Sequence, residues 1–393
     1  MSSITCPSAR AGTRFPIRRR CSFSGIGLSR IRPGWTGDHG NGLPSIPQRR
    51  STMTMTNQQA RYLEQLLATK SGGKPRVYDQ GEITTGWETR IHAFAVGYFA
   101  NGEERRDELI VRVFPGFRGV VQARNEFDIM NQVARWGVPT PRVDFVVTEE
   151  TPFGDPFIVM ERVSGESMAD ALRAAPESDV HRLVGAMVDP LVRLHEMPTN
   201  ELLTRRSEAT ADDDQISFVR PEQPDMRVAV DRYELRYFEP LLQWLDSRRE
   251  EVGPGNACVL HHDYHPHNIV VREDDGQLVV LDWSFADIGD FRLDLAWSAL
   301  LVGVTAGESY RDVLIQRYQA VSGLGVENFS YFEVLKLGAR LITIALWLEE
   351  SVVIPVSKIT KQAIRREYRV HVLNVYNRVK EITQLPIPLF ERL

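Results

Sequence analysis

The chain has 393 residues, of which 42% are hydrophobic and 25% are charged, and its formal net charge is −5 at pH 7. This composition is typical of a soluble globular protein and excludes a chain that is disordered throughout. The uncharged apolar stretches are too short to span a bilayer, and three cysteines (Cys6, Cys21, Cys258) offer neither a disulfide framework nor a paired metal-ligand spacing. We therefore expect a cytoplasmic protein without a membrane partner.

The first 52 residues carry nine arginines against one acid, Asp38, among many Ser, Gly and Pro residues. Their balance is +8, which leaves −13 for the remaining 341 residues and argues against a nucleic-acid partner. We predict that residues 1–56 form a disordered basic leader. It is either an extension upstream of a start at Met53 or Met55, or an organelle transit peptide. The lack of a sustained amphipathic period favours the extension.

A small mixed lobe is predicted next, at residues 57–162. Helical spacing over 58–70 ends at Gly72-Gly73, and alternating residues between Arg76 and Phe114 indicate antiparallel strands. Helical spacing returns over 119–136, and two more strands are expected at 143–148 and 156–163. Strands, one helix and strands again favour a small α+β lobe.

A larger lobe at residues 163–393 is predicted to be mainly helical. Helices are expected at 168–174, at 180–195, at 227–249 and in several segments from Leu293 to the end. A β-hairpin is predicted between these helices, with strands at residues 269–272 and 278–281 on either side of the turn Asp274-Asp-Gly276. We expect this lobe to hold the catalytic and substrate-binding groups.

The densest chemical signal is His261-His-Asp-Tyr-His-Pro-His-Asn268, followed by the hairpin and Leu281-Asp-Trp-Ser284. Phosphoryl transfer needs an acceptor hydroxyl held in line, a carboxylate to receive its proton, and Mg²⁺ to neutralise phosphate oxygens. Asp263 can orient the hydroxyl, while Asn268 and Asp282 offer the hard oxygen ligands that Mg²⁺ prefers. Because a short hairpin returns its ends to one place, we expect these three side chains to meet.

These motifs resemble the aminoglycoside phosphotransferase and choline kinase family, relatives of the protein kinases. There the loop reads roughly His-Gly-Asp-Leu-His-Pro-Gly-Asn, and the metal aspartate opens an Asp-Trp stretch followed by Gly-Asp-Pro and Asp-Leu-Ala. This chain has Asp282-Trp-Ser284, Gly289-Asp290-Phe291 and Asp294-Leu-Ala296. The resemblance implies the following roles: Asp263 as catalytic base, Asn268 and Asp282 as metal ligands, and His261 and Asp294 as structural support of the loop.

The resemblance extends to the small lobe. Gly86-Trp-Glu88 resembles the family's turn over the phosphates, and Ile110-Val-Arg112 resembles the strand that bears the phosphate-contacting cation. In the family this cation pairs with a glutamate on the following helix, which points to Glu126. Phe157–Glu161 resembles the linker between the lobes, where main-chain groups bind adenine. The resemblance thus implies nucleotide-binding residues Gly86, Arg112, Glu126, Glu161 and Val163.

The chain also departs from the family pattern. His262 and His267 replace the usual glycines of the catalytic loop, and Phe291 replaces the usual proline. Thr89 stands where an asparagine is usual, and Arg112 stands where lysine is common. Arginine keeps the charge of lysine but not its compact geometry.

Other functions compete for the same residues. Four histidines in seven residues beside Asp263 suit a zinc hydrolase, but Pro266 breaks the helix that zinc ligands at i, i+4 would need. A protein kinase is disfavoured, since no Asp-Phe-Gly or Ala-Pro-Glu activation segment is present. A catalytically silent nucleotide- or ligand-binding protein on the same scaffold remains the main alternative.

The sequence therefore predicts an α+β, protein-kinase-like fold with a small antiparallel sheet lobe and a larger helical lobe. We expect a small-molecule kinase that transfers the γ-phosphate of ATP or GTP, with Mg²⁺, to the hydroxyl of a small substrate. The −13 balance outside the leader favours a basic substrate.

Overall fold

The computed structural model describes residues 50–51, 55–71, 74–83, 89–100, 103–116, 118–200, 223–252, 257–349, 361–366 and 368–393. The predicted leader lies almost wholly outside these ranges. Within it, Arg50–Ser51 form the short strand β1, and the side chain of Met55 is buried. The described residues all belong to one compact unit, residues 42–393.

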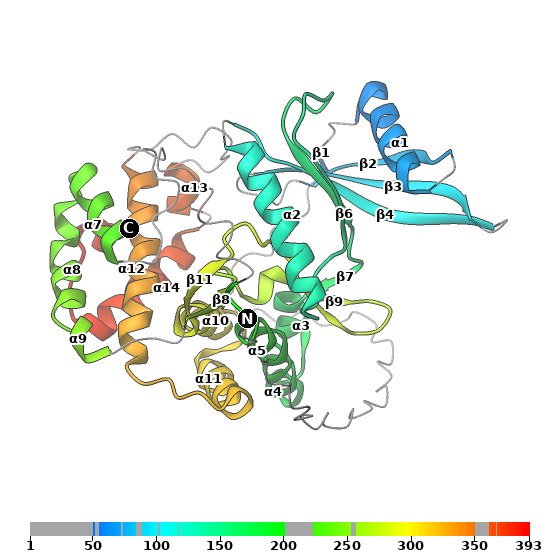
Figure 1. The fold of residues 1–393 in the computed structure, drawn as a ribbon. Helices are drawn as coiled ribbons and strands as arrows, with labels where there is room; N and C mark the ends of the chain where they lie inside the picture. The colour runs from blue at the N-terminus through cyan, green and yellow to red at the C-terminus, as the bar shows by residue number, and fades with distance from the viewer. Residues whose placement is uncertain are drawn as a thin grey trace, which may run out of the picture. The chain divides into compact units, whose positions relative to one another are not determined.

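One lobe is built on a six-stranded antiparallel sheet with the strand order β1-β2-β3-β4-β6-β5 (Figure 1). Two longer helices accompany it, α1 at Asn57–Ser71 and α2 at Gly119–Arg135. The strands are β2 at Arg76–Ile83, β3 at Arg90–Ala100, β4 at Glu103–Val113, β5 at Val143–Val147 and β6 at Phe157–Glu161.

Alternation along the strands decides which residues meet which helix. Phe157 and Val159 of β6 join the core under α1, whereas Ile158 and Met160 join the core under α2. Since successive side chains of a strand point to opposite faces, α1 and α2 cover opposite faces of the sheet. In β4, Leu109, Val111 and Val113 belong to the α1 side. Arg112 therefore points to the α2 side.

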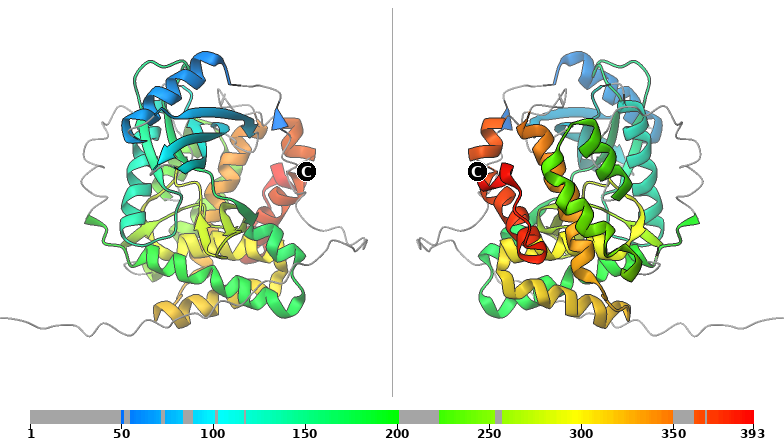
Figure 2. Two further views of the ribbon diagram at one scale, coloured as in Figure 1. Left: turned by 90° about the vertical axis from the view of Figure 1, so that its right-hand side faces the viewer. Right: turned by 90° about the vertical axis from the view of Figure 1, so that its left-hand side faces the viewer.

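The second lobe is mainly helical, and its larger helices pack into one core that also reaches the α2 face of the sheet (Figures 1 and 2). Its helices are α3 at Met168–Ala174, α4 at Glu177–Ala186, α5 at Val188–His195, α7 at Gln223–Arg232, α8 at Glu239–Asp246, α9 at Arg249–Val252, α10 at Phe291–Ala306, α11 at Glu308–Ser322, α12 at Phe329–Leu348, α13 at Lys361–Arg366, α14 at Arg369–Thr383 and α15 at Pro388–Glu391.

Short strands run between these helices. Hairpin strands β9 at Ile269–Arg272 and β10 at Leu278–Val280 pair with each other, and β7 at Gly165–Ser167 adds to β9. A second pair joins β8 at Ala257–Leu260 to β11 at Asp287–Asp290. The hairpin agrees with the sequence prediction, whereas β7, β8 and β11 were not predicted. The α+β two-lobe architecture is confirmed, and the boundary between residues 162 and 163 stays a prediction.

Two helices predicted as continuous are broken. The segment 180–195 divides at Met187 into α4 and α5, because Pro190 lacks the N–H that would bond back to Ala186. The segment 227–249 ends its first helix before Glu234, which has a left-handed φ of 55°, and continues as a short 3-10 turn and α8. Single positive-φ residues of this kind leave no mark in helical periodicity.

None of the helices within the described ranges combines the length and apolarity needed to cross a membrane. The longest, α12, carries Glu333, Lys336 and Arg340 within its 20 residues.

Candidate active site

The loop between β8 and β9 holds Asp263 in one orientation. Its Oδ1 accepts a hydrogen bond from Trp297 Nε1 at 2.8 Å and lies 3.3 Å from His265 Nε2. Its Oδ2 accepts from Asn268 Nδ2 at 2.9 Å, and the same amide donates to the Asp263 carbonyl at 3.0 Å. The carboxylate is therefore fixed from both sides by side chains of the loop and of α10.

The side chains of Asp263, Asn268 and Asp282 meet because the β9–β10 hairpin brings its two ends together. Leu281 N–H donates to the Asn268 carbonyl at 2.8 Å, so the residue after β10 lies against the residue before β9. Asp282 follows directly, with a left-handed φ of 61°. A non-glycine residue in this region is strained by about 1–3 kcal/mol and turns its side chain away from the strand direction. The structure thus brings Asp263, Asn268 and Asp282 together.

Arg112 of β4 reaches across to Asp282. Its Nη2 lies 2.8 Å from Asp282 Oδ1, and its Nη1 lies 3.0 Å from Glu126 Oε1 on α2. The Ser284 hydroxyl lies among the three charged groups, 2.8 Å from Glu126 Oε2 and 3.0 Å from both Asp282 Oδ1 and Arg112 Nη2. This cluster links β4 and α2 to the end of the hairpin.

The Arg112 guanidinium lies beside two carboxylates, Glu126 and Asp282, whose pKa values shift in opposite directions. Burial raises the pKa of Glu126 to about 7, against the opposing charge of Arg112 and with the help of Asp282. Burial also acts to raise the pKa of Asp282, but Arg112 outweighs it and the pKa lies below its usual value. Near neutral pH the positive charge of Arg112 thus mainly balances Asp282, and Glu126 keeps its proton part of the time.

Asp263 is strongly ionised. Burial would raise its pKa, but the charge and hydrogen bond of His265 and the charge of Arg340 outweigh burial, and the pKa lies well below its usual range. Asp263 is therefore a weak proton acceptor and a good anchor for a hydroxyl hydrogen.

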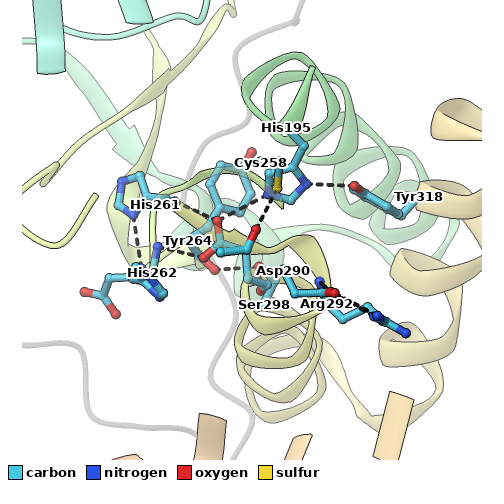
Figure 3. Close-up of polar contacts among 12 residues, drawn as sticks. His195, Cys258, His261, His262, Tyr264, Asp290, Arg292, Ser298 and Tyr318 are labelled. Carbon is cyan, nitrogen blue, oxygen red and sulfur yellow. Dashed lines mark hydrogen bonds and ion pairs between the residues drawn. The ribbon is translucent and has the colours of Figure 1, made fainter. Parts of the chain in front are cut away.

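Asp294, in the first turn of α10, holds the backbone of the catalytic loop by hydrogen bonds. Its two carboxylate oxygens accept from the backbone N–H groups of His261 at 2.7 Å and His262 at 2.6 Å. The side chain is fully buried, and His195 lies on it at 3.3 Å, with its other ring nitrogen 2.7 Å from the Tyr318 hydroxyl. Figure 3 shows His195 lying between Tyr318 and the loop residues. Burial opposes the ionised form, but His195 and the other histidines hold the pKa of Asp294 well below normal.

His261 supports the loop through both ring nitrogens. Its Nδ1 accepts from the backbone N–H of Asp263 at 3.2 Å, so its Nε2 carries the hydrogen and donates to the Leu281 carbonyl at 2.9 Å. The ring is fully buried and packs on Trp283 with a centroid distance of 4.6 Å. Burial lowers the pKa of His261, which keeps the ring neutral.

The histidines that replace the family's usual glycines behave differently. His262 has a left-handed φ of 64°, a conformation that glycine adopts without strain. Its carbonyl accepts from Lys336 Nζ of α12 at 2.6 Å. His267 donates its backbone N–H to His265 Nδ1 and has an ordinary backbone. Burial lowers the pKa of His267 to about 4, so its ring is neutral at pH 7.

The predicted adenine-binding segment follows β6. Glu161 N–H donates to the Arg142 carbonyl, and Arg162 N–H donates to the Glu108 carbonyl. The Glu161 carboxylate forms an ion pair with Arg272 at 3.0 Å, which ties β6 to β9. Val163 has no backbone hydrogen bond to the described part of the chain. The roles of Glu161 and Val163 stay predictions, and Gly86 lies outside the described residues.

The donor set fits Mg²⁺ better than zinc. Asn268 donates through Nδ2, which leaves Oδ1 as an acceptor, and Asp282 uses Oδ1 for Arg112 and Ser284, which leaves Oδ2. These are oxygen atoms of the kind that Mg²⁺ takes alongside substrate phosphates. Among the described residues, no three His, Cys, Asp or Glu side chains gather in a way that could hold a metal ion by themselves. The zinc hydrolase hypothesis therefore lacks a ligand set there.

Two site residues were not predicted. Ser284 was noted only as part of a motif, although its hydroxyl is central to the Arg112 cluster. Trp297 donates to Asp263 from α10, 34 residues away along the chain. Ser284 could have been found from its place two residues after Asp282, whereas Trp297 lies in a continuous apolar run that gives no local signal.

The family model described as "Phosphotransferase enzyme family" matches residues 94–329, more than half of the chain. A curated relative, acyl-CoA dehydrogenase family member 10 of Mus musculus, is 25% identical over 315 residues. That match covers 78% of this chain and 28% of the relative, so the chain spans less than a third of that protein's length.

Solved structures resemble the whole fold. A candidate aminoglycoside phosphotransferase from Ralstonia eutropha JMP134 has a TM-score of 0.55 at 14% identity, over 84% of this chain and 98% of that one. The GDP complex of an aminoglycoside 2′-phosphotransferase IIIa variant has a TM-score of 0.51 at 14% identity, over 83% and 97%. At such identities the likeness establishes the fold alone, and it is the kinase-like two-lobe fold.

Proposed function

Since the chain belongs to the phosphotransferase enzyme family, we propose that it is a small-molecule kinase with Asp263 as its catalytic base. The reaction transfers the terminal phosphate of ATP or GTP to a hydroxyl of a small substrate in the cytoplasm. The single observation that carries this proposal is the meeting of Asp263, Asn268 and Asp282 at the open end of one hairpin, with Arg112 bound to Asp282.

The acceptor hydroxyl would donate its hydrogen bond to Asp263. Trp297 and Asn268 hold the carboxylate at its two oxygens, so the direction in which it can accept is fixed. Its low pKa makes it a poor base for the ground-state alcohol. In a loose transition state this matters little, because the hydroxyl becomes acidic only as the O–P bond forms. The proton then passes to Asp263, and the nucleoside diphosphate leaves.

Mg²⁺ would be held by Asn268 Oδ1 and Asp282 Oδ2 together with phosphate oxygens, and it would supply neutralisation of their negative charge. Arg112 fixes Asp282 in a strained conformation and brings a cation to the same place. The role of Glu126 is to hold Arg112 in that direction from α2. Ser284 joins the three groups by hydrogen bonds.

The nucleotide would lie along the face of β4 that carries Arg112. We propose that adenine or guanine contacts the main chain near Glu161 and Val163, and that Gly86 belongs to the turn over the phosphates. The GDP bound by the solved relative supports the use of a nucleotide. The choice between ATP and GTP follows from the backbone groups after β6, which a competition experiment measures directly.

The experiment is nucleotide binding and turnover by the full chain. Binding of ATP and GTP is measured by calorimetry with and without Mg²⁺, and turnover is followed with a panel of alcohols, sugars, aminoglycosides and amino alcohols. The proposal predicts Mg²⁺-dependent nucleotide binding and acceptor-stimulated turnover. Binding without turnover for any acceptor would favour the catalytically silent scaffold, and absence of both would contradict the family-based proposal.

A further inference from the structure

The backbone of His262 is held by two charged side chains of opposite sign. Its N–H donates to Asp294 Oδ1 at 2.6 Å, and its carbonyl accepts from Lys336 Nζ at 2.6 Å. Asp294 lies on α10 and Lys336 lies on α12, and these two helices pack against each other. Two helices of the second lobe thus fix both polar backbone groups of the residue before Asp263.

These contacts fall where the backbone of the loop is strained. His262 has a left-handed φ of 64°, which a non-glycine residue keeps only where its surroundings hold it. The peptide unit between His262 and Asp263 is planar, so its carbonyl and its N–H are oriented together. Lys336 binds that carbonyl, and the His261 ring accepts from that N–H at 3.2 Å. The peptide unit is therefore held at both ends, which sets the direction in which the Asp263 side chain leaves the backbone.

Lys336 also lies beside the indole that holds the Asp263 carboxylate. Its Nζ is 5.8 Å from the centroid of the Trp297 ring, within the range of a cation–π contact. Trp297 Nε1 donates to Asp263 Oδ1 at 2.8 Å. One ammonium group therefore contacts two of the groups that orient Asp263, the peptide before it and the indole bound to its carboxylate.

The Lys336 side chain is charged near neutral pH. Burial lowers its pKa to about 8, and the charge of Arg340 acts in the same direction, whereas Asp294 and Asp263 oppose both. The ammonium form therefore predominates at pH 7. A charged donor forms a stronger hydrogen bond to a carbonyl than a neutral donor does, so the contact with His262 is stronger than an ordinary one.

We propose that Lys336 is a positioning residue, whose ammonium group fixes the peptide between His262 and Asp263 and so aims the carboxylate at the acceptor hydroxyl. The inference rests on the proposed kinase function and adds a residue that lies beyond the family match over residues 94–329. Lys336 acts through the catalytic loop and belongs to the helical lobe, whereas the nucleotide phosphates would meet Arg112 of the sheet. Loss of the ammonium group should therefore slow the transfer step and leave nucleotide binding unchanged.

The test uses variants of the full chain. Lys336→Met removes the charge and the donor but keeps an unbranched side chain, and Lys336→Arg keeps both the charge and a donor. Lys380→Met on α14 is the control, because Lys380 is 44% exposed and pairs with Glu391 at the surface. Hydrogen exchange of the backbone amides is followed by mass spectrometry in the loop, residues 260–268. The values of kcat and KM are measured with Mg²⁺, nucleotide and the acceptor that gives the highest wild-type rate.

Lys336→Met should make the amides of the loop exchange at least about tenfold faster, while those of α11 keep the wild-type rate. It should lower kcat by about 10- to 100-fold and leave the KM for the nucleotide within about threefold of the wild type, with full stoichiometry of nucleotide binding in calorimetry. Lys336→Arg should recover kcat to within about fivefold of the wild type, because the guanidinium can still donate to the carbonyl. Lys380→Met should change none of these values.

A wild-type rate of exchange in the loop, or a wild-type kcat, in Lys336→Met would overturn the inference. A fall in kcat that Lys336→Arg does not recover, or faster exchange throughout the helical lobe, would do the same, since either indicates a general loss of packing. Failure of the kinase proposal has a different signature, because the wild type would then turn over no acceptor, and the exchange rates alone would decide whether Lys336 holds the loop. If Lys336→Met does not fold, Lys336→Gln, which keeps a donor without the charge, takes its place with the same expected results.

Discussion

Arg112 and Asp282 are 170 residues apart in the chain and form an ion pair of 2.8 Å. The guanidinium comes from the fourth strand of the sheet, and the carboxylate comes from the turn after the β9–β10 hairpin. Glu126 binds the same guanidinium from α2, and the Ser284 hydroxyl touches all three groups. In the proposed kinase, the binding of Mg²⁺ and of the nucleotide phosphates depends on this cluster.

The first prediction concerns Glu126 and pH. Its folded pKa of about 7 lies above the ordinary 4.5, so the folded state binds more protons than the unfolded state between these values. Stability from the protonated form is full below pH 4.5 and is lost as pH rises through 7. Glu126→Gln removes this loss. The wild type should therefore lose up to about 3 kcal/mol relative to the variant between pH 4.5 and pH 8.

Urea unfolding of both proteins at several pH values measures the difference. Glu150→Gln is the matched control, because this exposed carboxylate lies in the loop after β5. Its stability difference from the wild type should be flat with pH. If the difference in unfolding free energy between the wild type and Glu126→Gln also did not change with pH, Glu126 would be ionised without loss of stability. The inference that Arg112 mainly balances Asp282 would then be wrong.

The second prediction concerns the arginine itself. Arg112→Met leaves two carboxylates near each other without their cation, and loss of one partner from a buried ion pair costs about 3–5 kcal/mol. We expect this loss in unfolding free energy, together with weaker Mg²⁺-nucleotide binding. The exposed Arg61→Met on α1 should stay within about 0.5 kcal/mol of the wild type. A stable Arg112→Met protein with intact nucleotide binding would refute the role of the pair.

The third prediction concerns Asp294. Asp294→Asn replaces one of two acceptor oxygens by an amide, so the N–H of His261 or of His262 loses its partner inside the protein. We expect a loss of about 1–3 kcal/mol in unfolding free energy and slower turnover, since the catalytic loop is no longer fixed. Unfolding curves and initial rates measure the two effects.

The loss should also depend on pH. Because the folded pKa of Asp294 is lowered, the stability that it contributes is full above its ordinary value of 3.8 and falls as pH drops further. The gap between wild type and Asp294→Asn should shrink in acid. Asp274→Asn in the exposed hairpin turn should show neither effect. An Asp294→Asn protein as stable and active as the wild type would mean that the loop is held by other contacts.

The fourth prediction uses the strain at His262. A non-glycine residue with a φ of 64° destabilises the folded state by about 1–3 kcal/mol. Glycine removes this strain, but it also makes the unfolded chain more flexible, which offsets part of the gain in stability. His262→Gly should therefore raise the unfolding free energy by about 0.5–1 kcal/mol. His181→Gly, in the ordinary helix α4, should lower it by about 1 kcal/mol. If His262→Gly is destabilising, its ring contributes packing that exceeds the backbone strain.

Local patterns in the sequence predicted the centre of the site. Asp263 and Asn268 are five residues apart, and Asp282 lies at the far end of a hairpin marked by Asp-Asp-Gly, so one turn prediction was enough to bring them together. Strands β2 to β6, α3 and the hairpin strands lie within the predicted ranges, whereas β1 falls in the segment predicted as a disordered leader. The family suggested by these motifs is confirmed by the family match over residues 94–329.

The remaining features depend on contacts between distant segments. The pair β8 and β11 consists of four-residue strands that gain stability only from each other and from the core, and propensity is weak at that length. The break at Glu234 depends on a single left-handed residue. The hydrogen bond from Trp297 to Asp263 was missed for the same reason, because the apolar run around Trp297 predicts a buried helix but not which group its indole meets.

The most direct test of the central claim is a comparison of wild type with Asp263→Asn in nucleotide turnover with Mg²⁺, using the acceptor that gives the highest wild-type rate. Asparagine keeps the size of the side chain and removes the charge. The proposal predicts a kcat lower by about 10²–10⁴-fold, with nucleotide affinity within a factor of about three of the wild type. Equal turnover by the two proteins, or nucleotide binding by both with turnover by neither, would contradict a catalytic role for Asp263.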